Sequence, residues 1–222
     1  MPGGQNDDAG PLVTIQFEHE RHGGPAYRGT IWRLPGTYPR DGSDAVRAEL
    51  LRWELLGILL VFFSGSALHF AFEWCGRTPL VAPFAAVNES VWEHLKLAFW
   101  PSVAYASMEY CFFGRHMANF VIAKAVGIAL MPLTIVLLFY CYTALVGHHV
   151  LWLDILIFFI AVAAGQLASC EMLIVAWPQG RWRMLGLIAL VLLAVGFAVF
   201  TFWAPRLAIF RDSTTGTYGV GS

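Results

Sequence analysis

The residues best suited to chemistry lie in one stretch of the chain, residues 88–96, with the sequence Asn-Glu-Ser-Val-Trp-Glu-His-Leu-Lys. This stretch brings together two carboxylates, an amide, an imidazole and an ammonium, whereas most of the surrounding chain is apolar. Carboxylates and imidazoles are the usual groups for acid–base catalysis and for metal coordination. We therefore treat Glu89, Glu93 and His94 as the candidate catalytic residues.

Histidines and a carboxylate elsewhere extend this stretch into a candidate metal site. His69 and Glu73 are four residues apart, so on a helix they would share one face. The candidate ligands are His69, Glu73, His94 and His148. Such ligands suit a divalent metal such as zinc, but the chain lacks the specific pattern of a His-Glu-x-x-His helix. The sequence alone leaves the cofactor unknown.

A purely structural interpretation of the same stretch competes with the chemical one. Ser90 and Glu93 match a capping box, in which the serine oxygen accepts from the amide of Glu93 and the glutamate returns to the serine amide. Lys96 follows Glu93 by three residues and can pair with it. On this interpretation the stretch is a well-made helix start. The two interpretations are compatible, and both are carried forward.

The elements that position these residues are membrane helices. Of the 222 residues, 58% are hydrophobic and only 13% are charged, whereas apolar residues make up about 45–50% of soluble domains. Five apolar segments are long enough to cross a bilayer, at about 51–74, 95–113, 120–146, 150–177 and 184–204. We expect an all-α, polytopic membrane bundle over 49–205, between an N-terminal region (1–48) and a C-terminal tail (206–222). The fifth segment is expected to serve packing alone.

The distribution of cationic residues predicts the orientation. Lys and Arg gather before the first segment and in the turns after the second and fourth segments. A cytoplasmic N-terminus puts these regions inside, as the positive-inside rule favours. The candidate catalytic and metal-binding residues would then share the outer face of the membrane.

A second polar group is expected deeper in the bundle, toward the cytoplasmic half. Glu109, Lys124 and Glu171 fall at similar depth in three different segments. Because unpaired charges in a bilayer are costly, we expect Lys124 to neutralise a glutamate and to tie helices together. A proton or ion path is the functional alternative.

The N-terminal region contains two loosely alternating runs, 12–18 and 27–33, that predict a short β-hairpin or a disordered tail. Such a tail could dock a membrane-protein partner. The net charge of −1 indicates no patch for nucleic acid, so the expected partners are the lipid bilayer and a protein.

The motif also carries a resemblance. Together with His69, Glu73-Trp74, Pro79 and Pro101, the stretch 88–96 resembles the signature of an uncharacterised family of small bacterial multi-pass membrane proteins, a domain of unknown function, over about 50–205. The resemblance implies a bacterial inner membrane location and no particular reaction.

A fainter similarity links the stretch to the Asn-Glu-Thr-x-Asn-Ile-Trp-Thr-His-Leu segment of the progestin/adipoQ receptors. These are seven-span zinc proteins, in a superfamily of membrane hydrolases that includes the alkaline ceramidases. The present chain departs from them, since it has five segments, its motif follows the first segment, and its later segments lack a His-x-x-x-His pair.

Three functions follow from the sequence. The first is a membrane-embedded, metal-dependent enzyme, such as a lipid hydrolase. The second is a non-catalytic subunit or scaffold of a membrane complex. The third is a small ion-coupled transporter, which five segments without internal repeats fit poorly. The sequence does not decide whether the protein is an enzyme.

Overall fold

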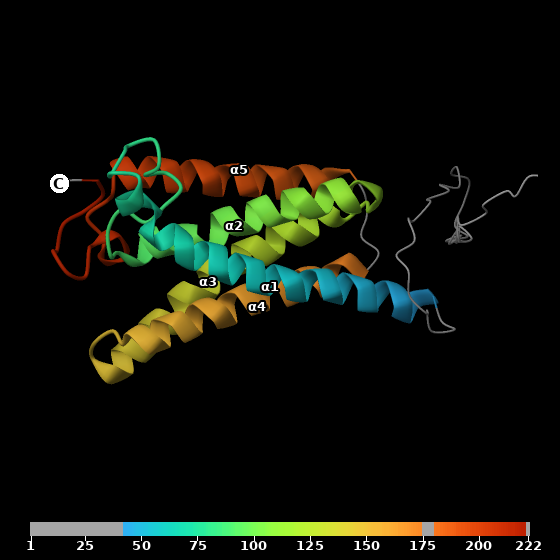
Figure 1. The fold of residues 1–222 in the computed structure, drawn as a ribbon, viewed down its shortest axis with the longest axis horizontal. Coiled ribbons are helices and arrows are strands. Elements are labelled where there is room, and N and C mark those ends of the chain that lie inside the picture. Colours follow the sequence, from blue (N-terminus) through green and yellow to red (C-terminus); the bar gives the residue numbers. More distant parts are fainter. Residues whose placement is uncertain (1–41, 175–179, 221–222) are drawn as a thin grey trace, which may run out of the picture. The chain divides into compact units, whose positions relative to one another are not determined.

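The protein folds into helices, as a computed structural model that describes residues 42–174 and 180–220 shows (Figure 1). Five α-helices follow one another, together with two short 3₁₀-helices: α1 (Gly42–Trp74), α2 (Val91–Phe112), η1 (Gly114–His116), α3 (Phe120–Val146), α4 (Leu151–Ile174), α5 (Arg181–Phe202) and η2 (Ala208–Phe210). The described residues contain no strand, only an isolated bridge between Arg211 and Tyr218. The prediction of an all-α fold is confirmed.

Four of the helices are long and apolar enough to cross a membrane, namely α1, α3, α4 and α5. The sequence predicted five such spans. The exception is α2, because its 22 residues include Glu93, Lys96 and Glu109. These three side chains are buried inside the protein. Helix α2 therefore carries charged residues near both of its ends, and their side chains face the bundle. With its four apolar helices, the chain is compatible with a membrane protein.

The chain divides into two units, 1–49 and 50–222, and the second unit holds the bundle. Helix α1 begins at Gly42, ahead of the predicted start of the bundle at residue 49. The predicted hairpin at 12–33 lies outside the described residues.

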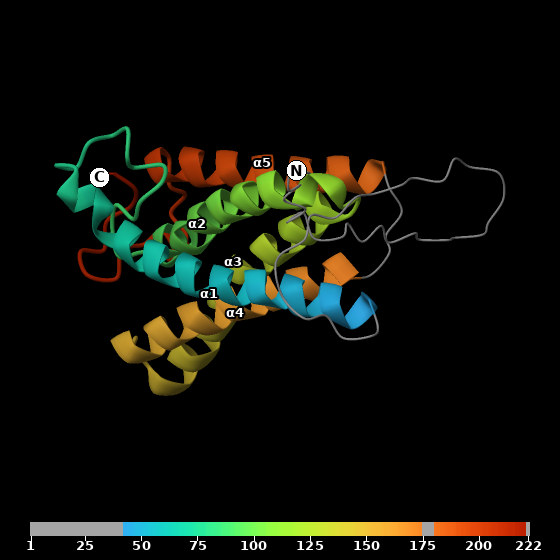
Figure 2. The same ribbon diagram turned by 45° about the vertical axis from the view of Figure 1, so that its right-hand side comes forward.

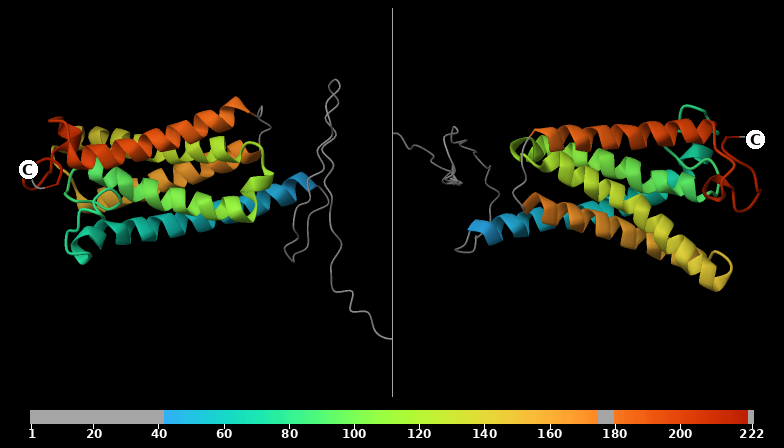
Figure 3. Two further views of the ribbon diagram at one scale, coloured as in Figure 1. Left: turned by 90° about the horizontal axis from the view of Figure 1, so that it is seen from above. Right: turned by 180° about the vertical axis from the view of Figure 1, so that it is seen from behind.

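Helix α3 is the centre of the bundle and packs against α2, α4 and α5 (Figure 2). In its most apolar stretch 44% of α3 is buried, against 17% for α5, which covers one side. The connection 75–90 and the segment after α5 lie together at one end of the bundle, which we call the 75–90 end (Figure 3). The opposite end carries the α2–α3 connection and is called the 113–119 end.

Small residues allow the helices to approach closely. A Cβ added to Gly127 of α3 would lie 2.5 Å from the carbonyl oxygen of Gly165 of α4, and one added to Gly165 would lie 2.5 Å from the oxygen of Gly127. Backbone atoms cannot yield to such contacts without moving a helix. Close approach through small residues is a common way to pack helices in membranes, where lipid is as apolar as a leucine side chain.

Helices α1 and α2 approach at Gly65, where an added Cβ would lie 2.4 Å from the carbonyl oxygen of Leu97. Leu97 is four residues before Pro101, which has no N–H to bond to that carbonyl. The missing side chain at Gly65 and the missing donor at Pro101 thus meet at the same place. The absence of a side chain at Gly65 lets α1 come close to the carbonyl of Leu97, which lacks its helical hydrogen bond because Pro101 has no N–H.

We predict that Gly127→Ala and Gly165→Ala each lower the stability of the protein. Overpacking of this kind costs about 1–3 kcal/mol. Thermal unfolding in detergent measures the effect. The matched control is Gly196→Ala in α5, where an added Cβ meets no atom within 4 Å. Equal midpoints for Gly127→Ala and Gly196→Ala would contradict the close α3–α4 contact.

Candidate metal centre

Helix α2 begins at the motif, and its first turn is capped by side chains. Ser90 is the N-cap, and its oxygen accepts from the amide of Glu93 at 3.3 Å. This half of the predicted capping box is confirmed. The other half differs, because the amide of Ser90 donates to Asn88 Oδ1 at 2.9 Å and Glu93 accepts instead from the amide of Val87 at 3.0 Å. Asn88 therefore takes the place that the capping box gives to Glu93.

Glu93 turns into the bundle, where it pairs with Lys96 as predicted. The Lys96 ammonium lies 2.5 Å from Glu93 Oε2, and the two side chains are 0% and 2% exposed. Lys96 also donates to the carbonyl of Ala82 at 2.7 Å and to Thr201 Oγ1 at 2.8 Å. The Thr201 hydroxyl has a single hydrogen, which it can donate either to the carbonyl of Phe197 at 2.8 Å or to Glu93 Oε1 at 3.2 Å. Both oxygens of Glu93 are thus engaged, and its role here is structural.

Helix α5 therefore does more than pack, in contrast to the prediction for the fifth segment. Thr201 of α5 accepts from Lys96 of α2 and so links the two helices. Thr201 was not singled out from the sequence. A single hydroxyl in an apolar run gives a weak signal, because such hydroxyls usually bond to their own helix.

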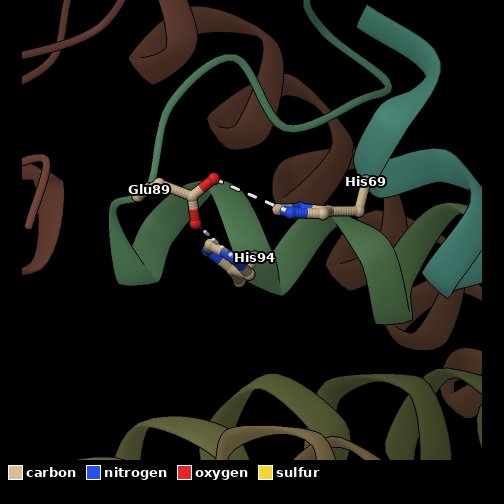
Figure 4. A group of neighbouring side chains, drawn as sticks. All are labelled: His69, Glu89 and His94. Carbon is tan, nitrogen blue, oxygen red and sulfur yellow. Dashed lines mark ion pairs between the residues drawn. The ribbon is translucent and has the colours of Figure 1, made fainter. Parts of the chain in front are cut away.

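Glu89 and His94 are less buried than Glu93, and His69 of α1 lies beside them (Figure 4). His94 Nε2 lies 3.4 Å from one oxygen of Glu89, and His69 Nε2 lies 3.7 Å from the other. One ligand atom from each residue can be chosen so that all three lie within 4.8 Å of one another. The histidine side chains are 27% and 36% exposed and that of Glu89 is 46% exposed, so the group is open on one side.

The protonation of His94 follows from its other ring nitrogen. His94 Nδ1 lies 2.8 Å from the carbonyl oxygen of Ser90, which can only accept, so Nδ1 carries the hydrogen. In a neutral ring, Nε2 then presents a lone pair to the carboxylate of Glu89. Two acceptors at 3.4 Å repel each other unless a cation lies between them or His94 is protonated. This geometry therefore requires a positive charge at His94 Nε2 and the Glu89 carboxylate, supplied either by a cation or by protonation of His94.

The loop that carries Glu89 is held by the segment after α5. Ser213 donates to the carbonyl of Glu89 at 3.2 Å, and Asn88 donates to the carbonyl of Gly219 at 3.1 Å. The predicted C-terminal tail is therefore folded against the motif as far as residue 220. Gly219 has a φ of +61°, and a Cβ there would lie 2.9 Å from the carbonyl oxygen of Thr201.

Two carboxyl groups at this end are ionised at neutral pH. Hydrogen bonding to His94 lowers the pKa of Glu89, against the opposing effect of burial. Burial raises the pKa of Asp212, but hydrogen bonds from Thr214 and Thr215 outweigh it and lower this pKa to about 2. Because the pKa is depressed in the folded protein, Asp212 stabilises the C-terminal segment at neutral pH. That contribution is lost as the pH falls from 3.8 toward about 2.

The chain as a whole matches one protein family. The model of a family of unknown function, DUF6512, matches residues 44–220. The chain belongs to this family. The match covers α1 from its third residue, all of α2 to α5, the motif and the segment after α5 as far as residue 220. No curated protein and no solved structure matches the chain.

Membership of DUF6512 agrees with the resemblance to an uncharacterised family and brings no reaction with it. The comparisons give no support to the similarity with the progestin/adipoQ receptors and the alkaline ceramidases.

Two of the predicted ligands, Glu73 and His148, lie apart from the group formed by His69, Glu89 and His94. Glu73 bonds to the exposed Arg77, with Oε1 2.9 Å from Arg77 Nε. His148 is exposed in the α3–α4 turn, and its neighbour His149 lies 3.5 Å from Asp154. Among the described residues, only His69, Glu89 and His94 form a group able to hold a metal. Glu73 is directed outward by its ion pair, while the α3–α4 turn lies away from the connection 75–90 (Figure 1).

A second polar layer lies toward the 113–119 end. Lys124 Nζ is 2.5 Å from Glu109 Oε2 and 2.6 Å from Glu54 Oε1. Glu171, which we placed in this layer, is exposed, because the buried face of α4 runs through Gln166, Ser169 and Cys170. Glu54 takes part in its place. The signal for Glu54 was present in the sequence as a carboxylate within the first apolar segment.

We predict that Lys96→Met destabilises the protein strongly, because it leaves Glu93 buried without its cation. Removal of one partner from a buried ion pair costs about 3–5 kcal/mol. Unfolding in detergent is the measurement, and the double variant Glu93→Gln/Lys96→Met should regain much of the loss. The control is Arg77→Met, which breaks the exposed pair with Glu73 and should change the unfolding midpoint little. Equal effects of Lys96→Met and Arg77→Met would show that the buried pair contributes no more than an exposed one.

Proposed function

We propose that this protein binds a divalent transition metal ion, with zinc the best fit, through His69, Glu89 and His94 at the 75–90 end of a membrane-spanning helix bundle. The main evidence for this site is that the three side chains come together from α1, the connecting loop and α2. Two imidazoles and one carboxylate are also the protein ligands of several catalytic zinc sites.

The distances support a metal at this position. With zinc–nitrogen and zinc–oxygen bonds near 2.0–2.2 Å, two ligands of a tetrahedral site are about 3.4 Å apart. Both imidazoles already lie near this spacing from the Glu89 carboxylate, with His94 Nε2 3.4 Å from one oxygen and His69 Nε2 3.7 Å from the other. A metal ion would also supply the positive charge that the lone pair of His94 and the Glu89 carboxylate require. The Ser90 carbonyl accepts from Nδ1 of His94 and orients the ring, as backbone carbonyls commonly do for metal-bound histidines.

Three protein ligands leave a fourth position for water. A zinc ion lowers the pKa of a bound water toward 7 and so makes hydroxide available for hydrolysis. The group is partly exposed at the end of an apolar bundle, so amphiphilic molecules could reach it. We therefore propose hydrolysis of a lipid-like ester or amide as the reaction. Glu89 and His94 would serve as ligands in that reaction, and Glu93 would hold the start of α2 in place.

We predict that the detergent-purified protein contains about one metal ion per chain, measured by elemental analysis. His69→Ala, His94→Ala and Glu89→Gln should each lower the metal affinity by at least about tenfold, since even outer-shell changes cost 10–100-fold. Affinity should also fall at acid pH, because the ligands must be deprotonated to bind.

The matched controls for the metal are His148→Ala and Glu73→Gln, which change residues outside the group and should keep full metal content. Full metal content in His94→Ala would contradict the proposed site. The reaction is tested separately with long-chain chromogenic esters and amides in micelles. Turnover that persists after the metal is removed would refute a metal-dependent reaction, and a metal-loaded protein without turnover would favour a non-catalytic subunit.

We also propose that the protein lies in the bacterial inner membrane, with its N-terminus in the cytoplasm and the metal site outside. Two native cysteines report on this: Cys75 is exposed just after α1, and Cys111 is exposed near the end of α2. Variants that keep only one of them should react differently with a membrane-impermeant maleimide in right-side-out vesicles. Cys75 should be labelled at once and Cys111 only after permeabilisation. The reverse pattern would invert the orientation.

A further inference from the structure

The polar layer at the 113–119 end joins four helices, with Lys124 in contact with two of the other three. Lys124 of α3 contacts Glu54 of α1 at 2.6 Å and Glu109 of α2 at 2.5 Å. Ser169 of α4 donates to the same oxygen of Glu54 at 3.2 Å. All three charged side chains are at most 3% exposed. The layer is thus sealed from its surroundings.

The charges of this layer do not balance when all of its groups are ionised. Two carboxylates face one ammonium, which leaves one negative charge. The other side chains of the layer are neutral, with Tyr105 donating to the carbonyl of Trp53 at 2.5 Å and Gln166 supplying an amide. An isolated charge buried in a low-dielectric interior is very costly, and such a group usually becomes neutral instead.

The charged residues nearest to the layer along the helices are exposed. Arg52 and Glu171 are exposed on α1 and α4, and Arg115 is exposed in η1. On α5, Arg183 is exposed and reaches Tyr110 at 3.4 Å. None of these side chains is buried with the triad of Glu54, Glu109 and Lys124.

The hydrogen bonds show which carboxyl group should carry a proton. Glu54 Oε1 accepts from both Lys124 and Ser169. Neither oxygen of Glu109 has a hydrogen bond from the described residues beyond its ion pair with Lys124. The negative charge is therefore better stabilised on Glu54. A hydrogen on Glu109 would also supply a donor where the layer has unsatisfied oxygens, among them Glu54 Oε2.

We propose that the triad of Glu54, Glu109 and Lys124 is a proton-binding site, which holds one proton on Glu109 at neutral pH. Glu109 lies three residues before the end of α2, a distance of about 4.5 Å along the helix axis. The 113–119 end of the bundle is therefore the nearer end for exchange of this proton with water. This site is independent of the proposed metal site, which lies at the other end.

The test is infrared spectroscopy of the full-length protein in liposomes, with the side-chain carboxyl carbons of glutamate labelled with ¹³C. The wild-type protein should show one protonated glutamate band at neutral pH, shifted by the label and sensitive to D₂O. The band should disappear as the pH is raised, when Glu109 loses its proton.

Three variants test the charge balance. Glu109→Gln and Glu54→Gln should each abolish the band, because the remaining carboxylate is neutralised by Lys124. Lys124→Met should increase it about twofold, because both carboxyl groups then need a proton. Glu73→Gln is the control and should leave the band unchanged, since Glu73 is exposed and paired with Arg77.

The outcomes separate the alternatives. Absence of the band in the wild-type protein at neutral pH would overturn the proposal, whatever the variants do. A band that persists in both glutamine variants would place the proton on another glutamate and would overturn it equally. Should one glutamine variant fail to fold, loss of the band in the other and its pH dependence in the wild-type protein decide the matter.

Discussion

The cost of a charge in an apolar interior is the constraint on which the bundle depends. Helix α2 carries Glu93, Lys96 and Glu109 into a core that otherwise consists of side chains such as Phe99 and Ala98. Each of these charges meets an opposite charge, and the pairs are completed by groups from other helices. The hydroxyl of Thr201 joins α5 to one pair, while Glu54 and Lys124 join α1 and α3 to the other. These polar contacts therefore fix the positions of the helices relative to one another more closely than apolar side-chain packing alone would.

The motif can serve both structure and chemistry because its residues point in two directions. Glu93 and His94 are neighbours on α2, so their side chains diverge by about 100° around the helix. Glu93 is directed into the core toward Lys96, while His94 is directed toward Glu89 and His69. The capping interpretation and the metal interpretation thus apply to different residues of one segment. A sequence pattern cannot separate them, since it does not fix which way the loop before the helix turns Glu89.

The helix bundle itself was predictable, because long apolar runs and their Gly and Pro breaks mark membrane helices strongly. His94 and His69 were named as ligands from their chemistry, and the structure brings them together. Glu89 was assigned an acid–base role, whereas its position between the two rings suits a ligand. Glu73 was expected beside His69, but the choice between facing inward and pairing with Arg77 depends on the turn that follows α1, where Arg77 has a φ of +57°.

The polar layer shows a different limit of the sequence. Similar depth in the membrane can be counted along each segment, and this placed Glu109 and Lys124 correctly at one level. Depth does not give rotation about the helix axis, and rotation decides that Glu171 is exposed while Ser169 is buried. Glu54 was overlooked although it lies within the first apolar segment, because a single carboxylate near the start of a span does not indicate which helix face is buried. Its burial follows from packing against α3 and α4, which no local pattern records.

The His69–Glu89–His94 group and the triad of Glu54, Glu109 and Lys124 lie far apart in the bundle. Glu109 follows His94 by fifteen positions on α2, or about 22 Å along its axis. The interior between them is built of Val61, Phe99, Ile128 and Met131. The hydroxyl of Ser102 lies on this path but donates to the sulfur of Met131. A proton moving between the clusters would need polar partners that the described side chains do not offer. Any coupling of the two ends would therefore have to pass through movement of α2 itself, which is held close to α1 at Gly65.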